Sequence, residues 1–225
     1  MVENKTNKNI VSDDWLTTTN RFVAFIDIMG FKDMIARTPH TEIYEMMKKI
    51  DERKKFSEDL DWSHAKSKLI RTTTYSDSIM LYTKDESYNS LYSLVCTVSS
   101  LTHDLFIDGI PHKGSIAFGL MTLDNEKSIY FGQPLIDAYL LQEELNFYGI
   151  ISHATAEILI AKYNAEDAIP FLANYLCPLK NGIAKHLTIF PIYAGRVSEQ
   201  DKKTQETFIE AIKKLRFKTS GYLRK

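Results

Sequence analysis

The feature that most constrains this sequence is an apolar run, Arg21–Phe31, which carries one carboxylate, Asp27, near its end. Its aliphatic and aromatic residues are typical of a buried β-strand. Burying an ionised carboxylate costs several kcal/mol, so Asp27 needs a cation or strong hydrogen-bond donors beside it. Gly30 follows, and a glycine lets backbone amides approach an anion closely. The alternative is that Asp27 caps a helix that starts near Lys32.

The composition is that of an ordinary globular protein and excludes several function classes. Its 28 Lys and Arg residues balance 29 Asp and Glu residues, so no net field favours nucleic acid or an anionic membrane surface. Cys96 and Cys177 lie in apolar segments without metal-ligand spacing, which favours reduced, buried thiols. Residues 1–20 lack the apolar core of a signal peptide, and no segment is long enough to span a membrane. We therefore expect a cytoplasmic protein.

Hydrophobic periodicity and turn residues predict an alternation of helices and strands along the 225 residues. The expected elements are a helix over 32–36, a helix over 43–50 with a charged connection over 51–63, two strands within 68–83, a helix over 91–105 that ends near Gly109, strands over 113–119 and 128–131 around a polar tip at 124–127, a helix over 134–147, helices over 154–162 and 165–175, a strand over 187–193 and a C-terminal helix over 199–216.

This order predicts an α+β fold of the ferredoxin-like type, with a mainly antiparallel sheet and helices packed on one face. We expect a flexible lead-in over residues 1–20, one domain over 21–195 and a basic helical extension over 196–225. No composition break indicates a second domain.

The hairpin within 68–83 carries a second candidate carboxylate, Asp77, at its turn. Side chains alternate across a strand, so Arg71, Thr73, Tyr75 and, if the extended geometry continues, Asp77 share one face. If the first strand neighbours this hairpin, Asp27 and Asp77 converge. Two carboxylates at one point repel unless a divalent cation bridges them, and hard oxygen ligands suit Mg²⁺ or Mn²⁺ holding a phosphate. The alternative is two unrelated capping residues.

Other chemistries lack their usual sequence signatures. The chain has no GxxxxGK[ST] phosphate-binding loop and no GxSxG nucleophile motif. Its six histidines lack the spacing of a zinc site, and its aromatic residues alternate with apolar rather than basic residues.

Several motifs together resemble the class III nucleotide cyclases. Phe25-Ile-Asp-Ile-Met-Gly-Phe31 is similar to the first metal motif of that family, and Tyr75-Ser-Asp-Ser78 is similar to its second-metal hairpin. The resemblance covers roughly residues 21–193 and continues through the segments 113–119, 132–139 and 178–182. The pattern is most similar to the bacterial pyrimidine cyclases of the Pycsar antiphage system.

The resemblance implies a homodimer with active sites at the subunit interface, which converts a nucleoside triphosphate into a 3′,5′-cyclic monophosphate and pyrophosphate. It implies two divalent cations, Mn²⁺ or Mg²⁺, held by Asp27, the carbonyl of Ile28 and Asp77. It also implies that the backbone around the start of the short helix binds the β- and γ-phosphates, through the amides of Met29, Gly30, Phe31 and Lys32. The cyclic nucleotide would then reach a separate effector.

The sequence departs from the purine cyclases of this family at two places. Thr73 stands where those enzymes carry a base-reading lysine, so we expect a pyrimidine to be read by a longer side chain, Arg71 or Tyr75. Ile136, Asp137 and Leu140 occupy the helix that carries their transition-state Asn and Arg. Lys113 could supply the missing charge; otherwise the enzyme is slow or inactive.

The sequence therefore predicts a pyrimidine nucleotide cyclase, with UTP preferred over CTP on the family's commoner behaviour. A purine cyclase and a catalytically inactive nucleotide-binding domain with regulatory function are the alternatives. We expect no nucleic-acid partner and no direct membrane contact.

Overall fold

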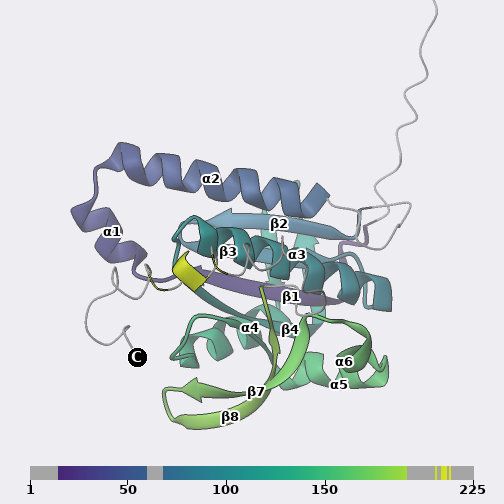
Figure 1. The fold of residues 1–225 in the computed structure, drawn as a ribbon. Helices are drawn as coiled ribbons and strands as arrows, with labels where there is room; N and C mark the ends of the chain where they lie inside the picture. The colour runs from purple at the N-terminus through teal and green to yellow at the C-terminus, as the bar shows by residue number, and fades with distance from the viewer. Residues whose placement is uncertain (1–14, 60–67, 192–205, 207–208, 212, 214–225) are drawn as a thin grey trace, which may run out of the picture.

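The computed structural model describes residues 15–59, 68–191, 206, 209–211 and 213 (Figure 1). The described strands are β1 (Thr18–Ile28), β2 (Ile70–Tyr75), β3 (Ser78–Thr83), β4 (His112–Asp124), β5 (Ile129–Gly132), β6 (Ile150–Ser152), β7 (Leu172–Leu179) and β8 (Gly182–Ile189). The described helices are α1 (Phe31–Arg37), α2 (His40–Asp59), α3 (Tyr88–Ile107), α4 (Gln133–Glu144), α5 (Ala154–Lys162) and α6 (Ala165–Ala168), and residues 206, 209–211 and 213 are also helical.

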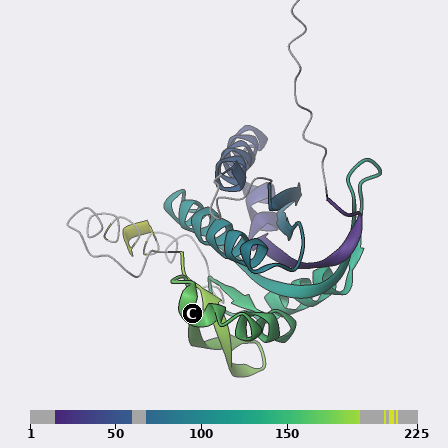
Figure 2. The ribbon, with the colours of Figure 1, turned by 90° about the vertical axis from the view of Figure 1, so that its right-hand side faces the viewer.

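The strands form one sheet in the order β2-β3-β1-β4-β6-β8-β7, with β5 paired to β4. Every pairing between named strands is antiparallel except that of β4 with β6. This confirms the predicted α+β fold with a mainly antiparallel sheet. The sheet is strongly curved when seen along its side (Figure 2), as the natural twist of strands requires.

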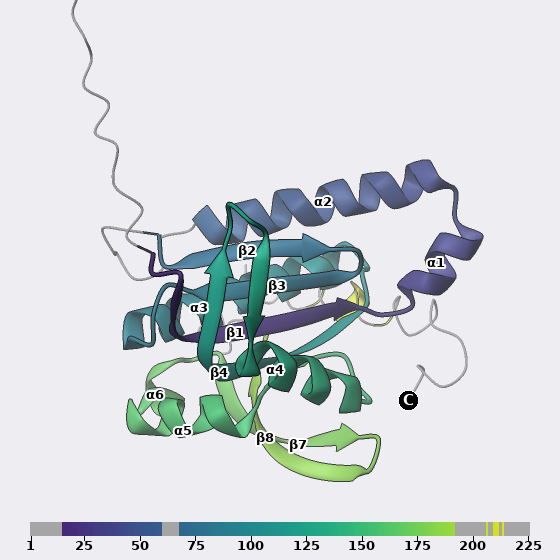
Figure 3. The same ribbon diagram turned by 180° about the vertical axis from the view of Figure 1, so that it is seen from behind.

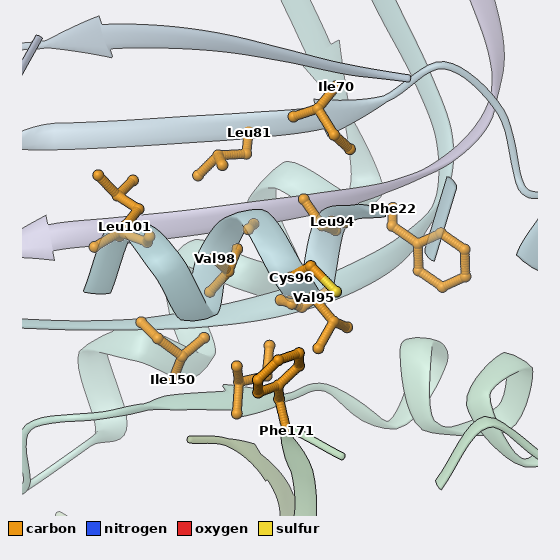
Figure 4. Packing of buried hydrophobic residues seen from close by; sticks show 14 of the residues in the cluster. Phe22, Ile70, Leu81, Leu94, Val95, Cys96, Val98, Leu101, Ile150 and Phe171 are labelled. Atoms are coloured by element: carbon orange, nitrogen blue, oxygen red, sulfur yellow. The ribbon is translucent and has the colours of Figure 1, made fainter. Parts of the chain in front are cut away.

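The central strand β1 separates two packing faces by simple alternation of its side chains. Phe22, Ala24 and Ile26 point into the main core, where they meet α3 residues such as Leu94 and Val98 (Figure 4). Burying this continuous apolar stripe of α3 against the sheet stabilises the fold through the hydrophobic effect.

Helix α4 packs on the opposite face, which corrects the expectation that the helices share one face. Ala138 of α4 contacts Phe25 of β1 and Ala117 of β4, and Ser115 Oγ donates to the Ala138 carbonyl at 2.6 Å. Figure 3 shows α4 on the face of the sheet away from α3. The odd-numbered positions of β1, Asp27 among them, point to the α4 side.

Several predicted boundaries are wrong. Helix α2 continues to Asp59 instead of giving way to a charged connection at Asp51, because lysine and glutamate are good helix formers and an i, i+4 ion pair joins Asp51 to Lys55 at 2.6 Å. The predicted 165–175 helix ends at Ala168, and β7 begins at Leu172. The last strand among the described residues, β8, begins at Gly182 and ends at Ile189, whereas the prediction was 187–193; residues 192 and 193 lie outside the described residues.

Regular structure begins before residue 21, the predicted start of the domain. Strand β1 begins at Thr18, and Trp15 Nε1 already donates to the Lys68 carbonyl at 3.1 Å. Most of the predicted C-terminal helix over 199–216 lies outside the described residues. In the part of the chain that the structure describes, no helix has both the length and the apolarity needed to cross a membrane.

Candidate active site

The structure brings Asp27 and Asp77 together at one end of the sheet. Asp27 is the penultimate residue of β1 and is paired with Ser78, the first residue of β3. Asp77 lies in the turn just before, and its carbonyl accepts a hydrogen bond from the Ile28 amide at 2.9 Å. Antiparallel pairing of β1 with β3 therefore places both carboxylates, 50 positions apart in sequence, at the same strand end.

The position of Asp77 corrects one detail of the sequence prediction. Strand β2 ends at Tyr75, and Ser76 adopts a left-handed φ of 54°, so strand alternation does not extend to Asp77. Its place is fixed by the two-residue turn and by the Ile28 hydrogen bond.

The electrostatics of Asp27 favour a cation beside it. Its pKa is raised to about 6, first because burial disfavours the charged carboxylate, and then because the charges of Asp77 and Glu143 repel it. Lys113 partly offsets this by lowering the same pKa. A divalent cation would relieve the repulsion, so the donor set fits Mg²⁺ or Mn²⁺. Among the described residues, no group of three or more Asp, Glu, His or Cys side chains forms a metal cluster, so the two carboxylates need backbone oxygen, substrate or water to complete a shell.

Lys113 is the β4 register partner of Asp27, and its side chain is buried, with 8% exposed. Its Nζ donates to the carbonyls of Glu143 and Leu145, each at 3.4 Å, at the C-terminal end of α4. Burial lowers the pKa of Lys113, while Glu143 and Asp27 act in the opposite direction. Lys113 thus ties α4 to the carboxylate end of β1 and satisfies helix carbonyls that lack intrahelical partners.

The predicted phosphate-binding segment forms the connection from β1 to α1. Gly30 is the N-cap of α1 with φ 75°, a left-handed conformation that costs a residue with a side chain roughly 1 kcal/mol or more. Phe31 and Lys32 lie in the first turn, where helix amides have no intrahelical acceptor. The Met29 amide already donates to the Pro111 carbonyl at 2.8 Å, so it is engaged in this structure.

The two predicted base-reading residues lie at different distances from the carboxylates. Strand register places Tyr75 in one row with Ser78 and Asp27, and 78% of its side chain is exposed. Arg71, the second residue of the same strand, is four positions before Tyr75, about 13 Å along the strand, and its guanidinium lies over the Trp15 ring at 4.3 Å. Arg71, Thr73 and Tyr75 share one face of the regular strand β2, as predicted. Of the two base-reading candidates, Tyr75 rather than Arg71 lies near the Asp27 of the same chain.

Sequence reasoning missed Glu143, which influences both charged groups of the site. Its charge acts on Asp27 and on Lys113, and its carboxylate pairs with Lys180 Nζ at 3.6 Å. Lys180 lies at the tip of the β7–β8 hairpin, whose backbone bonds to the end of α4. The available signal was helix spacing, because Glu143 follows Ile136 and Leu140 on one face of α4.

No protein-family model and no curated protein sequence matches this chain. Among solved structures, it is similar to the catalytic core of a rhodopsin-guanylyl cyclase with converted specificity, determined in complex with ATPαS. The superposition has a TM-score of 0.56 at 13% sequence identity and covers 76% of this chain and 95% of the other. The chain therefore has the fold of a nucleotide cyclase catalytic core, as the sequence motifs predicted.

Proposed function

We propose that this protein is a divalent-metal-dependent nucleotide cyclase. The observation that carries the proposal is the convergence of Asp27 and Asp77 at adjacent strand ends, within the fold of a cyclase catalytic core. A half-buried carboxylate with a raised pKa at such a point is costly unless it serves a cation or a reaction.

In this reaction the ribose 3′-oxygen attacks the α-phosphorus, a new phosphoester bond forms, and the bond to pyrophosphate breaks. Asp27, Asp77 and the Ile28 carbonyl would hold two Mn²⁺ or Mg²⁺ ions, which supply charge neutralisation for the triphosphate and acidify the 3′-hydroxyl. The amides at the start of α1 would orient the β- and γ-phosphates, so that the attack is in line. Lys113 would hold positive charge near Asp27.

The proposed substrate is a pyrimidine nucleotide, UTP in preference to CTP. Thr73 supports this choice, because its short side chain replaces the base-reading lysine expected of the purine enzymes that this chain resembles. Tyr75 is exposed and lies level with Asp27 across the neighbouring strands, so it is the base-contacting candidate within the same chain. Arg71 is a candidate from a second copy.

A homodimer is part of the proposal, because the face that bears Asp27 also exposes large apolar side chains. Ile136, Tyr139 and Leu140 of α4 are 51%, 46% and 56% exposed. Tyr139, also exposed, packs edge-on against Phe25 of β1, which places this patch on the Asp27 side of the sheet. Ile136 and Leu140 lie one helical turn apart, and neighbouring exposed apolar side chains of this kind are typical of an interaction site. A facing copy could bring its own Arg71 to the site.

The cellular role that we propose follows the family resemblance: the cyclic nucleotide acts as a second messenger in antiphage defence and reaches a separate effector. The sequence motifs quoted above support this role, and the cyclase fold is compatible with it.

The proposal is tested by incubating the purified protein separately with ATP, GTP, CTP and UTP in the presence of Mn²⁺, followed by mass spectrometry of the products. We expect cyclic UMP as the main product. Cyclic AMP or cyclic GMP as the main product would reject the pyrimidine assignment and retain the cyclase.

A catalytically inactive nucleotide-binding domain is the second candidate. Ile136 and Leu140 favour it, because they occupy helix positions where purine cyclases carry transition-state Asn and Arg residues. Binding of UTP with Mn²⁺ but no cyclic product from any of the four nucleotides would select this candidate.

A further inference from the structure

A cleft of about 760 Å³ lies beside the predicted phosphate-binding segment, between α1, α2 and the α3–β4 connection. Its apolar lining consists of buried and half-buried side chains, with three methionines among them: Met29, Met34, Met46, Ile110 and Pro111. Methionine side chains adapt to different partners and are common on surfaces that bind apolar side chains. The volume is within the range of ligand pockets, so it can take several side chains of a docked segment.

The charged lining of this cleft has an excess of carboxylates. It contains the four acidic residues Asp33, Glu42, Glu45 and Asp108, and the two basic residues Arg37 and Lys49. Asp108 pairs with Arg53 at 3.2 Å, and Glu45 pairs with Lys48 at 3.9 Å. Asp33 and Glu42 are exposed, one on each of the two helices that flank the cleft. An apolar segment with a positive charge would complement this lining.

The C-terminal segment of the chain has this character. Residues 214–225 contain four large apolar residues, five basic residues and no acidic residue: Leu215, Phe217, Tyr222 and Leu223, with Lys214, Arg216, Lys218, Arg224 and Lys225. The last described residue before this segment, Lys213, belongs to a short helical stretch in which Ala211 is buried. This stretch (yellow) lies close to the end of α3 in two views (Figures 1 and 2).

The end of α3 leads directly into Asp108–Pro111, which forms one wall of the cleft. Twelve residues in extended conformation span up to about 40 Å, so the segment is long enough to cross from Lys213 to α1 and α2. We propose that residues 214–225 dock in this cleft of the same chain. Their apolar side chains lie on the methionines, and their basic side chains face Asp33 and Glu42.

Docking would brace α1 and, through it, the predicted nucleotide site. Helix α1 has no fully buried residue, and its N-cap Gly30 provides no side-chain cap, so the helix is held chiefly by the partly buried Phe31 and Met34, which pack against the core. Met29 and Gly30 line the cleft and also connect Asp27 to α1. The C-terminal segment would therefore set the position of the phosphate-binding amides; this consequence rests on the proposed cyclase function, whereas the docking does not.

Zero-length carbodiimide crosslinking of the full-length chain, read by mass spectrometry, tests the docking. We expect crosslinks from Lys214, Lys218 or Lys225 to Asp33 or Glu42. Glu52 is the control acceptor, because it is exposed on α2 but does not line the cleft. Equal yields at Glu52, or no crosslinks to Asp33 and Glu42, would overturn the proposal.

Mixing ¹⁴N- and ¹⁵N-labelled protein before crosslinking identifies which chain contributes the segment. Docking within one chain predicts crosslinks between peptides of the same label. Crosslinks that join light to heavy peptides in statistical proportion would instead assign the segment to a second copy and overturn the intrachain arrangement.

A second readout uses trypsin, which cleaves after the basic residues of the segment. The full-length double variant Asp33→Lys/Glu42→Lys should be cut within 214–225 several-fold faster than the wild type, and Glu52→Lys should be cut at the wild-type rate. Both substituted residues are exposed, so the fold should persist. Equal cleavage rates in all three proteins would contradict docking. Neither readout depends on nucleotide turnover, so failure of the cyclase proposal would be seen separately.

Discussion

At the scale of single residues, Asp27 lies where several charges meet. Asp77 and Glu143 raise its pKa, Lys113 lowers it, and burial outweighs each of them, giving a pKa of about 6. If Asp27 served only to cap the strand-end turn, its desolvation would be an unnecessary cost, since an exposed side chain could form the same cap. The cost is understandable if the carboxylate has to be desolvated and close to Asp77 for cation binding.

A second buried titratable residue, His112, gives a prediction for stability. It is fully buried on the register row of Ile28, its Nδ1 bonds to the Ile110 carbonyl at 2.9 Å, and burial lowers its pKa to about 4. Because the folded-state pKa is below the unfolded value near 6.5, the unfolded state takes up the proton first. The contribution of His112 to stability is therefore complete above pH 6.5 and is lost as the pH falls toward 4.

We expect this loss to amount to about 2 kcal/mol between pH 7.5 and pH 5. Asp27 acts in the opposite direction, because its pKa is raised, so the comparison must isolate His112. Denaturant unfolding of the wild type and of His112→Asn at both pH values does so. The variant should lose about 2 kcal/mol less than the wild type on acidification; parallel losses would show that His112 does not titrate as its burial implies.

The sequence allowed some of these residues to be predicted and not others. Asp27 and Asp77 could be paired because each lies at the end of a strand, and strand ends meet when neighbouring strands are antiparallel. The influence of Glu143 on Asp27 could not be predicted, because it depends on α4 crossing the sheet at β4. The burial of His112 depends in the same way on contact with the Phe106 ring, at 4.3 Å between ring centroids.

At the scale of elements, Lys113 joins β4 to α4, and the β7–β8 hairpin joins the same helix end. The Lys180 amide donates to the Glu144 carbonyl at 2.8 Å, and the Asn146 amide donates to the Pro178 carbonyl at 3.0 Å. The end of α4 is thus attached to the strand that pairs with Asp27 and to the edge of the sheet. Removing the Lys113 ammonium should weaken both attachments.

Lys113→Met should lower the free energy of unfolding by about 1–3 kcal/mol, because two helix carbonyls lose a buried charged donor. The matched control is Lys127→Met at the β4–β5 tip, where the Lys127 side chain is exposed and pairs with Asp124. The change in the free energy of unfolding caused by this substitution should be too small to resolve. Urea unfolding of the three proteins measures the difference. Equal stabilities would mean that the Lys113 contacts contribute nothing to the fold.

Elements with local signals could be predicted, and those that depend on distant pairing could not. Helix α3 has a continuous apolar stripe, and the β2–β3 hairpin has β-branched residues around a turn. Strand β6 has only three residues and pairs with β4 and β8, while β7 has four consecutive exposed residues and shows no alternation. Their sequences therefore lack the period that identifies a strand.

At the scale of the whole molecule, the exposed apolar side chains of α4 lead to a test of the homodimer. Ile136→Asp/Leu140→Asp should produce a folded monomer, because charges at the centre of an apolar interface are costly to desolvate. Light scattering after size-exclusion chromatography gives the oligomeric state. Ile158→Asp on α5, where the side chain is 66% exposed, is the matched control and should remain dimeric. A dimer in the double variant would place the interface elsewhere.

The general architecture follows from the sequence because the β1 strand, the β2–β3 hairpin and α3 are specified locally, and the sheet order then places the two aspartates together. The dimer interface cannot be predicted from the sequence in this way. Residues such as Ile136 and Leu140 carry no pattern that distinguishes an interface from an ordinary exposed position until the fold places them on the Asp27 side of the sheet.

The central claim is that Asp27 and Asp77 hold the cations of a nucleotide cyclase. The most direct measurement is cyclic UMP formation from UTP with Mn²⁺ by the wild type, Asp27→Asn and Asp77→Asn, with Asp124→Asn at the end of β4, on the β4–β5 hairpin, as control. We predict a loss of roughly 100-fold or more in both site variants, since metal stabilisation of several kcal/mol is removed, with circular dichroism unchanged. Turnover within a few-fold of the wild type in either site variant would contradict the account.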